Sequence, residues 1–247
     1  MIGLVLAAGQ GARLRPETDT LPKTLLAVDG ESTILDVILR NLAKVDVADV
    51  VVVAGYAADE VIARVPDLES RHGVSIEIIR NDRFDRNNAY SLWLARDAYA
   101  DGALLVNGDT VHPVDVEQTL LTAPTGAGRS SDLILALDVT KQLGDEAMKV
   151  TLSDAGTVRR ITKRMPISEA HGEYIGATLI GASVANDLAA ALDETWRRDP
   201  NLYYEDGYQL LADQGVPVGA APLPPLDWVE VDDHADLARA RELACRC

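Results

Sequence analysis

Short, continuous runs of apolar residues alternate along the chain with amphipathic stretches. Continuous apolarity is typical of strands that helices cover on both faces, whereas a strand with one wet face alternates apolar and polar positions. Such runs predict strands over residues 2–7, 50–53, 74–79, 103–106, 174–182 and 228–231. Amphipathic stretches predict helices over 57–72, 89–99, 184–198 and 204–213, with another helix starting after Thr33 and one closing the chain. The pattern therefore predicts an α/β fold.

The second half of the chain departs from this alternation. We expect a loop rich in proline, glycine and serine at 124–131, and residues 148–162 predict a hairpin around a Ser-Asp-Ala-Gly turn. Parallel strands with right-handed crossovers should therefore form the first half of the sheet, and antiparallel strands the second. Because no internal repeat or long linker divides the chain, we predict one domain over residues 1–247, with three αβα layers around a mixed, mainly parallel, Rossmann-like sheet.

Composition narrows the classes of partner. The 247 residues carry 39 acidic and 23 basic side chains, and the formal net charge of −16 repels both a nucleic-acid backbone and an anionic membrane surface. Cys245 and Cys247 have neither a disulfide nor a metal-ligand spacing, and no segment approaches the roughly 18 apolar residues of a membrane span. We expect a cytoplasmic protein that binds neither nucleic acid nor membrane.

The first predicted strand runs directly into a glycine-rich loop, LAAGQGARLRP, at residues 6–16. Such a loop exposes backbone N–H groups to an anion, which favours a phosphate site; an ordinary tight turn is the alternative. Leu14 stands where a dinucleotide-binding fingerprint has its third glycine, and no Gly-Lys-Ser/Thr follows. Arg13, Arg15 and Lys23 place three cations in or near this loop, which favours phosphate binding.

These residues resemble a known family. LAAGQGARLRP followed by LPKTLLAV is similar to the signature of the sugar-phosphate nucleotidyltransferases. NDRFDRNNAYSLWLARDA, at 81–98, is most similar to the small cytidylyltransferases that activate phosphocholine and related phospho-alcohols or phosphonates. VNGDT, YIGATLI and WVEVDD extend the resemblance over nearly the whole chain. Ala12 departs from it, because the family usually has serine or threonine there, and the C-terminal repeat or helical domain of many sugar-nucleotide enzymes has no counterpart.

The resemblance implies a nucleotidyltransferase of this fold that depends on Mg²⁺. It would join CTP to a phosphorylated alcohol or a phosphonate, giving a CDP-alcohol or a CMP-phosphonate and pyrophosphate. Its catalytic residues would be Arg13 and Lys23, which hold the triphosphate, together with Asp109. A sugar-1-phosphate or inositol-1-phosphate nucleotidyltransferase is the nearest alternative. A dinucleotide-dependent oxidoreductase and a non-catalytic nucleotide-binding regulator are alternatives from other classes.

Three carboxylates are candidate metal ligands. Asp109 follows the buried run at 103–106, so it lies at the carboxyl end of a central strand, where open α/β sheets bind ligands; a helix cap is the alternative. Trp228, Glu230 and Asp232 are spaced two residues apart, which places them on one face of a strand. Neighbouring carboxylates repel each other unless a cation lies between them, although solvated surface acids are also common. The resemblance makes Asp109, with Glu230 or Asp232, the ligands of Mg²⁺.

The resemblance also assigns a nucleotide-binding set from the glycine-rich loop, the residue before Asp109 and the Asn-rich segment 81–91. Its members are Leu6, Ala7, Ala8, Gly9, Gln10, Gly11, Asn81, Asn87, Asn88, Ser91 and Gly108. The amide and hydroxyl groups of the Asn-rich segment can hydrogen-bond the edge of a pyrimidine base, whereas such segments otherwise cap helices.

A third set is expected around the acceptor: Lys163, Glu173, Tyr174, Tyr203, Tyr204, Glu205 and Trp228. The resemblance places Lys163 against the acceptor's phosphate, and an exposed lysine at a hairpin edge is the alternative. Tyr203, Tyr204 and Trp228 stand near acidic residues in the sequence, which suits an ammonium group, so we expect an acceptor with a small cationic head. Core packing is the alternative, which we favour for Tyr208 and Trp196. The state of assembly stays open, with a homodimer among the expectations.

Overall fold

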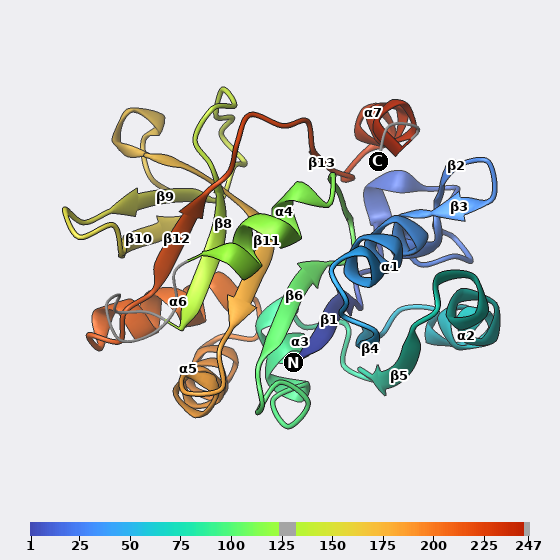
Figure 1. Ribbon diagram of the computed structural model, residues 1–247, viewed down its shortest axis with the longest axis horizontal. Coiled ribbons are helices and arrows are strands. Elements are labelled where there is room, and N and C mark those ends of the chain that lie inside the picture. The colour runs from blue at the N-terminus through green and yellow to red at the C-terminus, as the bar shows by residue number, and fades with distance from the viewer. Residues whose placement is uncertain (124–131, 245–247) are drawn as a thin grey trace.

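The computed structural model describes residues 1–123 and 132–244 (Figure 1). Within these residues, nine strands form one central sheet. They are β1 (Ile2–Ala7), β4 (Asp49–Ala54), β5 (Ser75–Arg80), β6 (Ala103–Asn107), β8 (Leu133–Asp138), β9 (Lys149–Leu152), β10 (Val158–Thr162), β11 (Gly172–Ile180) and β12 (Gly219–Pro222). The loop expected at 124–131 and the two C-terminal cysteines lie outside the described residues.

The first half of the sheet is parallel, as predicted. β1 pairs with β4 and β6, and β4 pairs with β5, all in parallel register. The four consecutive valines of β4 show why this pattern is continuous. Val50 and Val52 pack into one hydrophobic cluster, while Val51 and Val53 pack into a second cluster on the opposite face. Both faces of the strand are therefore buried, and an alternating polar position would be left without water.

β11 connects the parallel half of the sheet to an antiparallel half. It runs antiparallel to β6, β8 and β9, and β9 and β10 form the hairpin expected at 148–162. The strand order is β10-β9-β11-β6-β1-β4-β5, and β8 joins β11 to β12, to which it is parallel. The predicted α/β class with a mixed sheet is confirmed.

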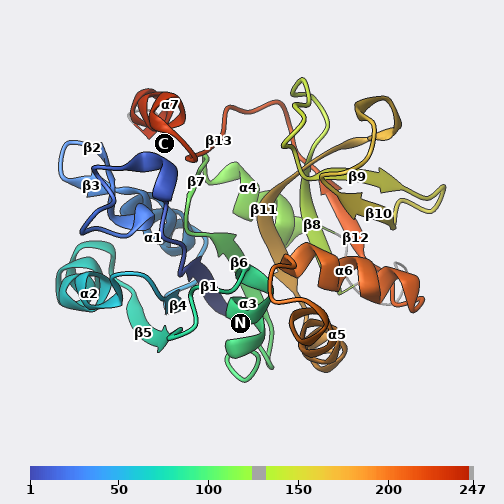
Figure 2. The ribbon, with the colours of Figure 1, turned by 180° about the vertical axis from the view of Figure 1, so that it is seen from behind.

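Helices cover both faces of the sheet. α1 (Ile34–Lys44), α2 (Ala58–His72), α4 (Asp115–Thr122) and α7 (His234–Ala244) contribute to one hydrophobic cluster, and α3 (Asn88–Leu94), α5 (Ala185–Arg198) and α6 (Tyr204–Asp213) contribute to the other. Figure 1 shows the side of α1 and α4, and Figure 2 shows the side of α3, α5 and α6. Across the described ranges, no helix is long and apolar enough to cross a membrane.

Element boundaries differ from the predictions where the chain has to turn. Thr33 caps α1 as predicted, because its hydroxyl accepts a hydrogen bond from the N–H of Asp36 at 3.2 Å. α3 ends at Leu94 instead of residue 99, since the chain reverses through turns and Gly102, whose φ is 94°, to enter β6. The remaining short elements are η1 (Ala12–Leu14), η2 (Lys23–Leu25), η3 (Ile167–Glu169), β2 (Ala27–Asp29), β3 (Ser32–Thr33), β7 (Thr110–Val111) and β13 (Val229–Glu230).

Candidate active site

The glycine-rich loop leaves the carboxyl end of β1 and turns at once into η1. Gly11 has a φ of 63°, a conformation that L side chains rarely adopt, and its carbonyl accepts hydrogen bonds from the N–H of Leu14 and the hydroxyl of Thr18. The turn buries Leu14 and leaves the side chain of Arg13 67% exposed. The sequence therefore folds here so that the loop presents a cation above the end of the sheet.

A second glycine brings Asp109 beside this loop. The N–H of Gly108 donates to the carbonyl of Leu6 at 2.9 Å, and a Cβ at position 108 would lie 2.6 Å from that same oxygen. Any larger residue would push the segment after β6 away from the segment after β1. Because β1 and β6 are adjacent parallel strands, their carboxyl ends lie at the same edge of the sheet. The close approach at Gly108 brings the segments that follow these two strands into contact.

Four charged side chains from three parts of the chain meet at this edge. Lys23 Nζ lies 2.8 Å from Asp109 Oδ2 and 2.9 Å from Asp232 Oδ1, and an Arg13 guanidinium nitrogen lies 2.8 Å from Asp232 Oδ2. Burial alone would lower the pKa of Lys23, but the two carboxylates outweigh it and hold that pKa above its usual value. Burial tends to raise the pKa of Asp232, yet Lys23 and Arg13 lower it. Lys23 and Asp232 are therefore both charged at neutral pH.

Glu230 completes a cluster of three carboxylates. Oxygens of Asp109, Glu230 and Asp232 lie within 4.8 Å of one another. β13 pairs with β7, and the N–H of Val231 donates to the carbonyl of Asp109, which holds the two segments side by side. Desolvation, followed by the charges of Asp109 and Asp232, raises the pKa of Glu230 to about 7.

The carboxylate cluster fits a divalent cation. Hard cations such as Mg²⁺ prefer carboxylate oxygens, and three of them converge here. Glu230 has no ion-pair or hydrogen-bond partner among the residues that the structure describes, so Lys23 and Arg13 compensate only Asp109 and Asp232 directly. A cation between the three carboxylates would relieve the repulsion that raises the pKa of Glu230.

A cavity of about 240 Å³ lies against this charged edge. Residues of the predicted nucleotide, metal and acceptor sets line it together: Leu6, Ala8, Gly9, Arg13, Asn87, Asn88, Ser91, Asp109, Lys163, Tyr203, Glu230 and Asp232. Phe84, Arg86 and Asn107 line it as well and were missed, although each lies inside a segment that carried the family resemblance. Ala7, Gln10, Gly11, Lys23, Asn81 and Gly108, which were also expected at the site, do not line it.

The Asn-rich segment contributes both to the wall and to helix capping. Asn81 is buried, and its Nδ2 donates to the hydroxyl of Ser91 at 3.0 Å, so it fixes a wall residue from behind. The side chain of Asn87 caps α3 by accepting from the N–H of Asn88. Asn88 Oδ1 accepts from the N–H of Tyr204 at 2.9 Å, which ties α3 to α6.

A second cavity of about 250 Å³ adjoins the first, and Lys163 and Tyr203 line both. Lys163 Nζ lies 5.3 Å from the centroid of the Tyr203 ring and 4.0 Å from Glu146 Oε2. Glu205 also lines the second cavity. It is only 6% exposed, and its Oε2 has no hydrogen-bond partner within the described part of the chain. Burial, reinforced by the charge of Glu230, raises the pKa of Glu205 to about 8.

Four of the residues expected around the acceptor lie outside both cavities. Tyr174 and Tyr204 are buried, and their hydroxyls are 3.0 Å apart; that of Tyr204 also donates to Asn107 Oδ1 at 2.9 Å, so this pair supports the cavity wall from the core. Glu173 is buried near Lys141, with 3.7 Å between its Oε2 and the ammonium nitrogen.

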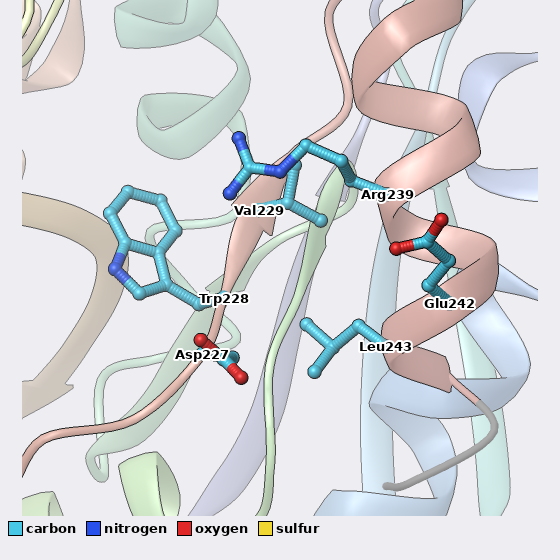
Figure 3. A pocket seen from close by; sticks show the side chains of 6 residues that line it. All are labelled: Asp227, Trp228, Val229, Arg239, Glu242 and Leu243. Atoms are coloured by element: carbon cyan, nitrogen blue, oxygen red, sulfur yellow. The ribbon is translucent and has the colours of Figure 1, made fainter.

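Trp228 also faces away from the carboxylate cluster. Its Nε1 donates to Asp138 at 2.7 Å, and Trp228 lines a separate pocket together with Arg239 and Leu243 of α7 (Figure 3). The sequence placed Trp228 on the same strand face as Glu230, but Trp228 lies outside the strand, because β13 begins at Val229. Of the four aromatic residues expected around the acceptor, Tyr203 alone lines either of these two cavities.

Several known proteins resemble this chain in sequence. Residues 2–143, more than half of the chain, match the family model described as nucleotidyl transferase. The choline-phosphate cytidylyltransferase of Streptococcus pneumoniae is 30% identical over 106 residues, which are 42% of this chain and 43% of that protein, less than two thirds of its length. The 2-aminoethylphosphonate cytidylyltransferase of Lancefieldella rimae is 28% identical over 250 residues, 98% of this chain and 89% of that one.

A solved structure shares the fold over nearly the whole chain. The inositol-1-phosphate CTP transferase from T. maritima superposes with a TM-score of 0.79 at 23% identity, covering 99% of this chain and 94% of the other. The family model matches residues 2–143, the solved structure shares the fold, and cations and carboxylates cluster at the edge of the sheet. This chain therefore belongs to the nucleotidyl transferase family.

Proposed function

We propose that this protein transfers a cytidylyl group from CTP to a phosphorylated alcohol or a phosphonate and releases pyrophosphate. The observation that carries the proposal is a pair of adjoining cavities that share Lys163: Arg13 and the carboxylate cluster line one of them, and Lys163 lies where it meets the other. The whole chain, residues 1–247, would act as one domain. It would work in the cytoplasm, where nucleoside triphosphates are available, and as a homodimer.

The reaction needs little from the protein beyond positioning and charge. An anionic oxygen of the acceptor attacks the α-phosphorus of CTP, the new O–P bond forms, and the bond to pyrophosphate breaks. The attacking oxygen is already deprotonated, so no general base is required. Mg²⁺ held by Asp109, Glu230 and Asp232 would supply positive charge to the phosphate oxygens. The chain must hold both substrates in line and neutralise the charge of the departing pyrophosphate.

Lys23 and Arg13 suit the triphosphate. An ammonium has three N–H donors, and two of those on Lys23 bind Asp109 and Asp232, which leaves one for a phosphate oxygen. Arg13 uses one terminal nitrogen for Asp232, so the rest of its exposed guanidinium can bind phosphate. Their bonds to the carboxylates fix both cations before the substrate arrives, and this preorganisation is what charge stabilisation requires.

The far wall of the first cavity suits a pyrimidine base that offers acceptors. Asn88 uses its Oδ1 for Tyr204, and Ser91 accepts from Asn81. Within the part of the chain that the structure describes, this leaves the Nδ2 of Asn88 and the O–H of Ser91 to donate to a ligand. The O2 and N3 atoms of cytosine are acceptors. Two relatives of this chain are cytidylyltransferases by name, which supports the choice of CTP.

The second cavity suits the head of the acceptor, and Glu205 suits a cationic head. A buried carboxyl with a pKa of about 8 is mostly protonated at neutral pH, and a neighbouring ammonium would stabilise its ionised form. Tyr203, on the rim, offers an aromatic face to the same cation. The acceptors named for the two relatives, choline phosphate and 2-aminoethylphosphonate, both carry such a head.

Pyrophosphate release tests the proposal directly. The purified protein, with Mg²⁺, is assayed with each of the four ribonucleoside triphosphates against phosphocholine, phosphoethanolamine, 2-aminoethylphosphonate, glucose 1-phosphate and inositol 1-phosphate. We expect turnover with CTP and a cationic acceptor. Preference for a sugar or inositol phosphate would move the assignment to that branch of the family. Tight CTP binding without pyrophosphate release would indicate a regulator, and the absence of both would refute the proposal.

A further inference from the structure

Lys149 carries a buried ammonium whose partners are all backbone carbonyls. The residue is 1% exposed, and its Nζ donates to the carbonyl oxygens of Asp145 at 2.6 Å, Lys163 at 2.8 Å and Ala147 at 3.3 Å. These three hydrogen bonds use all three of its N–H groups. Burying an ammonium is costly unless it is fully hydrogen-bonded, so this geometry is a demanding one to maintain.

The three carbonyls belong to two segments at the open end of the β9–β10 hairpin. Asp145 and Ala147 precede β9, whereas Lys163 directly follows β10, where Thr162 pairs with Lys149. Glu146, between the two braced carbonyls, lies 4.0 Å from Lys163 Nζ. A single buried side chain therefore fixes the backbone on both sides of the ion pair between Glu146 and Lys163, and this lysine lines both cavities.

The rest of the hairpin has supports of its own. Its strands are joined by a backbone ladder, and at the edge of β10 the side chain of Gln209 accepts from the N–H of Ile161 and donates to the carbonyl of Arg159. If the side chain at position 149 only filled space in the core, an apolar residue would be more favourable, because it would bury no charge. The ammonium adds a contact that the ladder lacks, since it defines where the chain leaves β10.

We propose that Lys149 is a positioning residue that holds the backbone of Lys163, and through it the Lys163 ammonium, at the place where the acceptor's phosphate binds. This inference rests on the proposed function, which gives Lys163 that role. A displacement of the Lys163 backbone would move its ammonium away from the phosphate and would leave the nucleotide end of the first cavity, with Arg13 and Asn88, unchanged.

A double-mutant cycle separates this role from a purely structural one. Lys149→Met should raise the KM for the preferred acceptor by about tenfold, with the KM for CTP unchanged. In a Lys163→Ala background the same substitution should change the acceptor KM by less than about twofold, because it acts through the missing side chain. Gln209→Ala is the matched control: it removes another brace on β10 and should leave the acceptor KM unaltered.

A second measurement does not depend on turnover. Lys163 is one of five lysines in the chain, so its rate of acylation by a small anhydride can be followed by mass spectrometry. We expect Lys149→Met to speed acylation of Lys163 at least about twofold, since the braced segment loses its anchor, and Gln209→Ala to leave the rate unchanged. If Lys149→Met does not fold, Lys149→Arg takes its place in both experiments, because a guanidinium cannot donate to all three carbonyls from the same point.

The possible failures point to different conclusions. If the wild-type protein turns over no acceptor, or if Lys163→Ala leaves the acceptor KM unchanged, the proposed function of the site fails, and the acylation rate still decides whether Lys149 positions Lys163. If Lys163→Ala raises the acceptor KM but the folded Lys149 variant does not, or if the effects of the two substitutions multiply, the positioning role is refuted and the proposed function stands.

Discussion

The ammonium of Lys23 lies 2.8 Å from a carboxylate oxygen of Asp109, although 86 residues separate them in the chain. Lys23 follows the loop that leaves β1, Asp109 follows β6, and these strands are parallel neighbours in the sheet. The same ammonium also binds Asp232, which follows β13. One side chain thus joins three segments, and both its charge and its position depend on the assembled sheet.

Lys23→Ala should reduce turnover at saturating nucleotide and not only raise the nucleotide KM. Charge builds up on the departing pyrophosphate beyond the ground state, so a cation that meets it contributes most in the transition state. Steady-state kinetics with varied CTP separate the two effects. A change confined to KM would mean that Lys23 binds the nucleotide without assisting the chemistry.

Asp109→Asn should fold normally and lose roughly a hundredfold or more in rate, because it removes a carboxylate ligand from the cluster that fits a divalent cation. Pyrophosphate release at several Mg²⁺ concentrations measures the loss. Asp233→Asn is a matched control nearby, since Asp233 accepts hydrogen bonds from the N–H groups of Ala235 and Asp236 at the start of α7. Full activity in a folded Asp109 variant would remove this residue from the metal site.

Glu205→Gln should weaken discrimination in favour of cationic acceptors. A cation near an aromatic face and a carboxylate gains on the order of 0.5–2 kcal/mol, so the wild type should prefer phosphocholine or 2-aminoethylphosphonate over a neutral-headed analogue by about tenfold. The amide keeps the shape of the side chain and loses the charge. The ratio of kcat/KM for 2-aminoethylphosphonate and 2-hydroxyethylphosphonate reports the change; a ratio unaffected by the substitution would exclude Glu205 from the recognition of the head.

Glu117 should make the protein less stable as the pH rises from about 6.5 to about 8. It is fully buried on α4, neither carboxyl oxygen has a hydrogen-bond partner among residues 1–123 and 132–244, and burial raises its pKa to about 8. The folded state therefore holds a proton that the unfolded state, with a pKa near 4.5, has released, so the free energy of unfolding falls as pH rises through this window.

Glu117→Gln should remove this dependence, and the difference between variant and wild type should grow by on the order of 2 kcal/mol between those two pH values. Denaturant unfolding at several pH values measures it. The difference is needed because Glu205 and Glu230 also carry raised pKa values. His112, next to Glu117, has its pKa lowered to about 4 by burial and stays neutral throughout the window. A constant difference would show that Glu117 does not hold its proton.

The sequence predicted most strands of the central sheet and most of the helices, because burial imposes a local pattern on each. Two strands of the central sheet were missed. β8 is an apolar run that was not assigned, and β12 has the sequence GAAP, which carries little preference for a strand and gains its structure only by pairing with β8. Pairing of that kind leaves no local signal.

The sequence by itself also identified the residues proposed for the chemistry of the site: the glycine-rich loop with its cations, Asp109 after a buried strand, and the acidic pair Glu230 and Asp232. Only the tertiary structure decided which groups share a cavity. It turned Trp228 toward Asp138, buried Tyr204 behind Asn107, and left the buried Oε2 of Glu205 without a hydrogen-bond partner among the described residues. The direction of an aromatic or acidic side chain depends on where its short element docks against distant strands, and that docking is set by packing over the whole sheet instead of by the neighbouring residues.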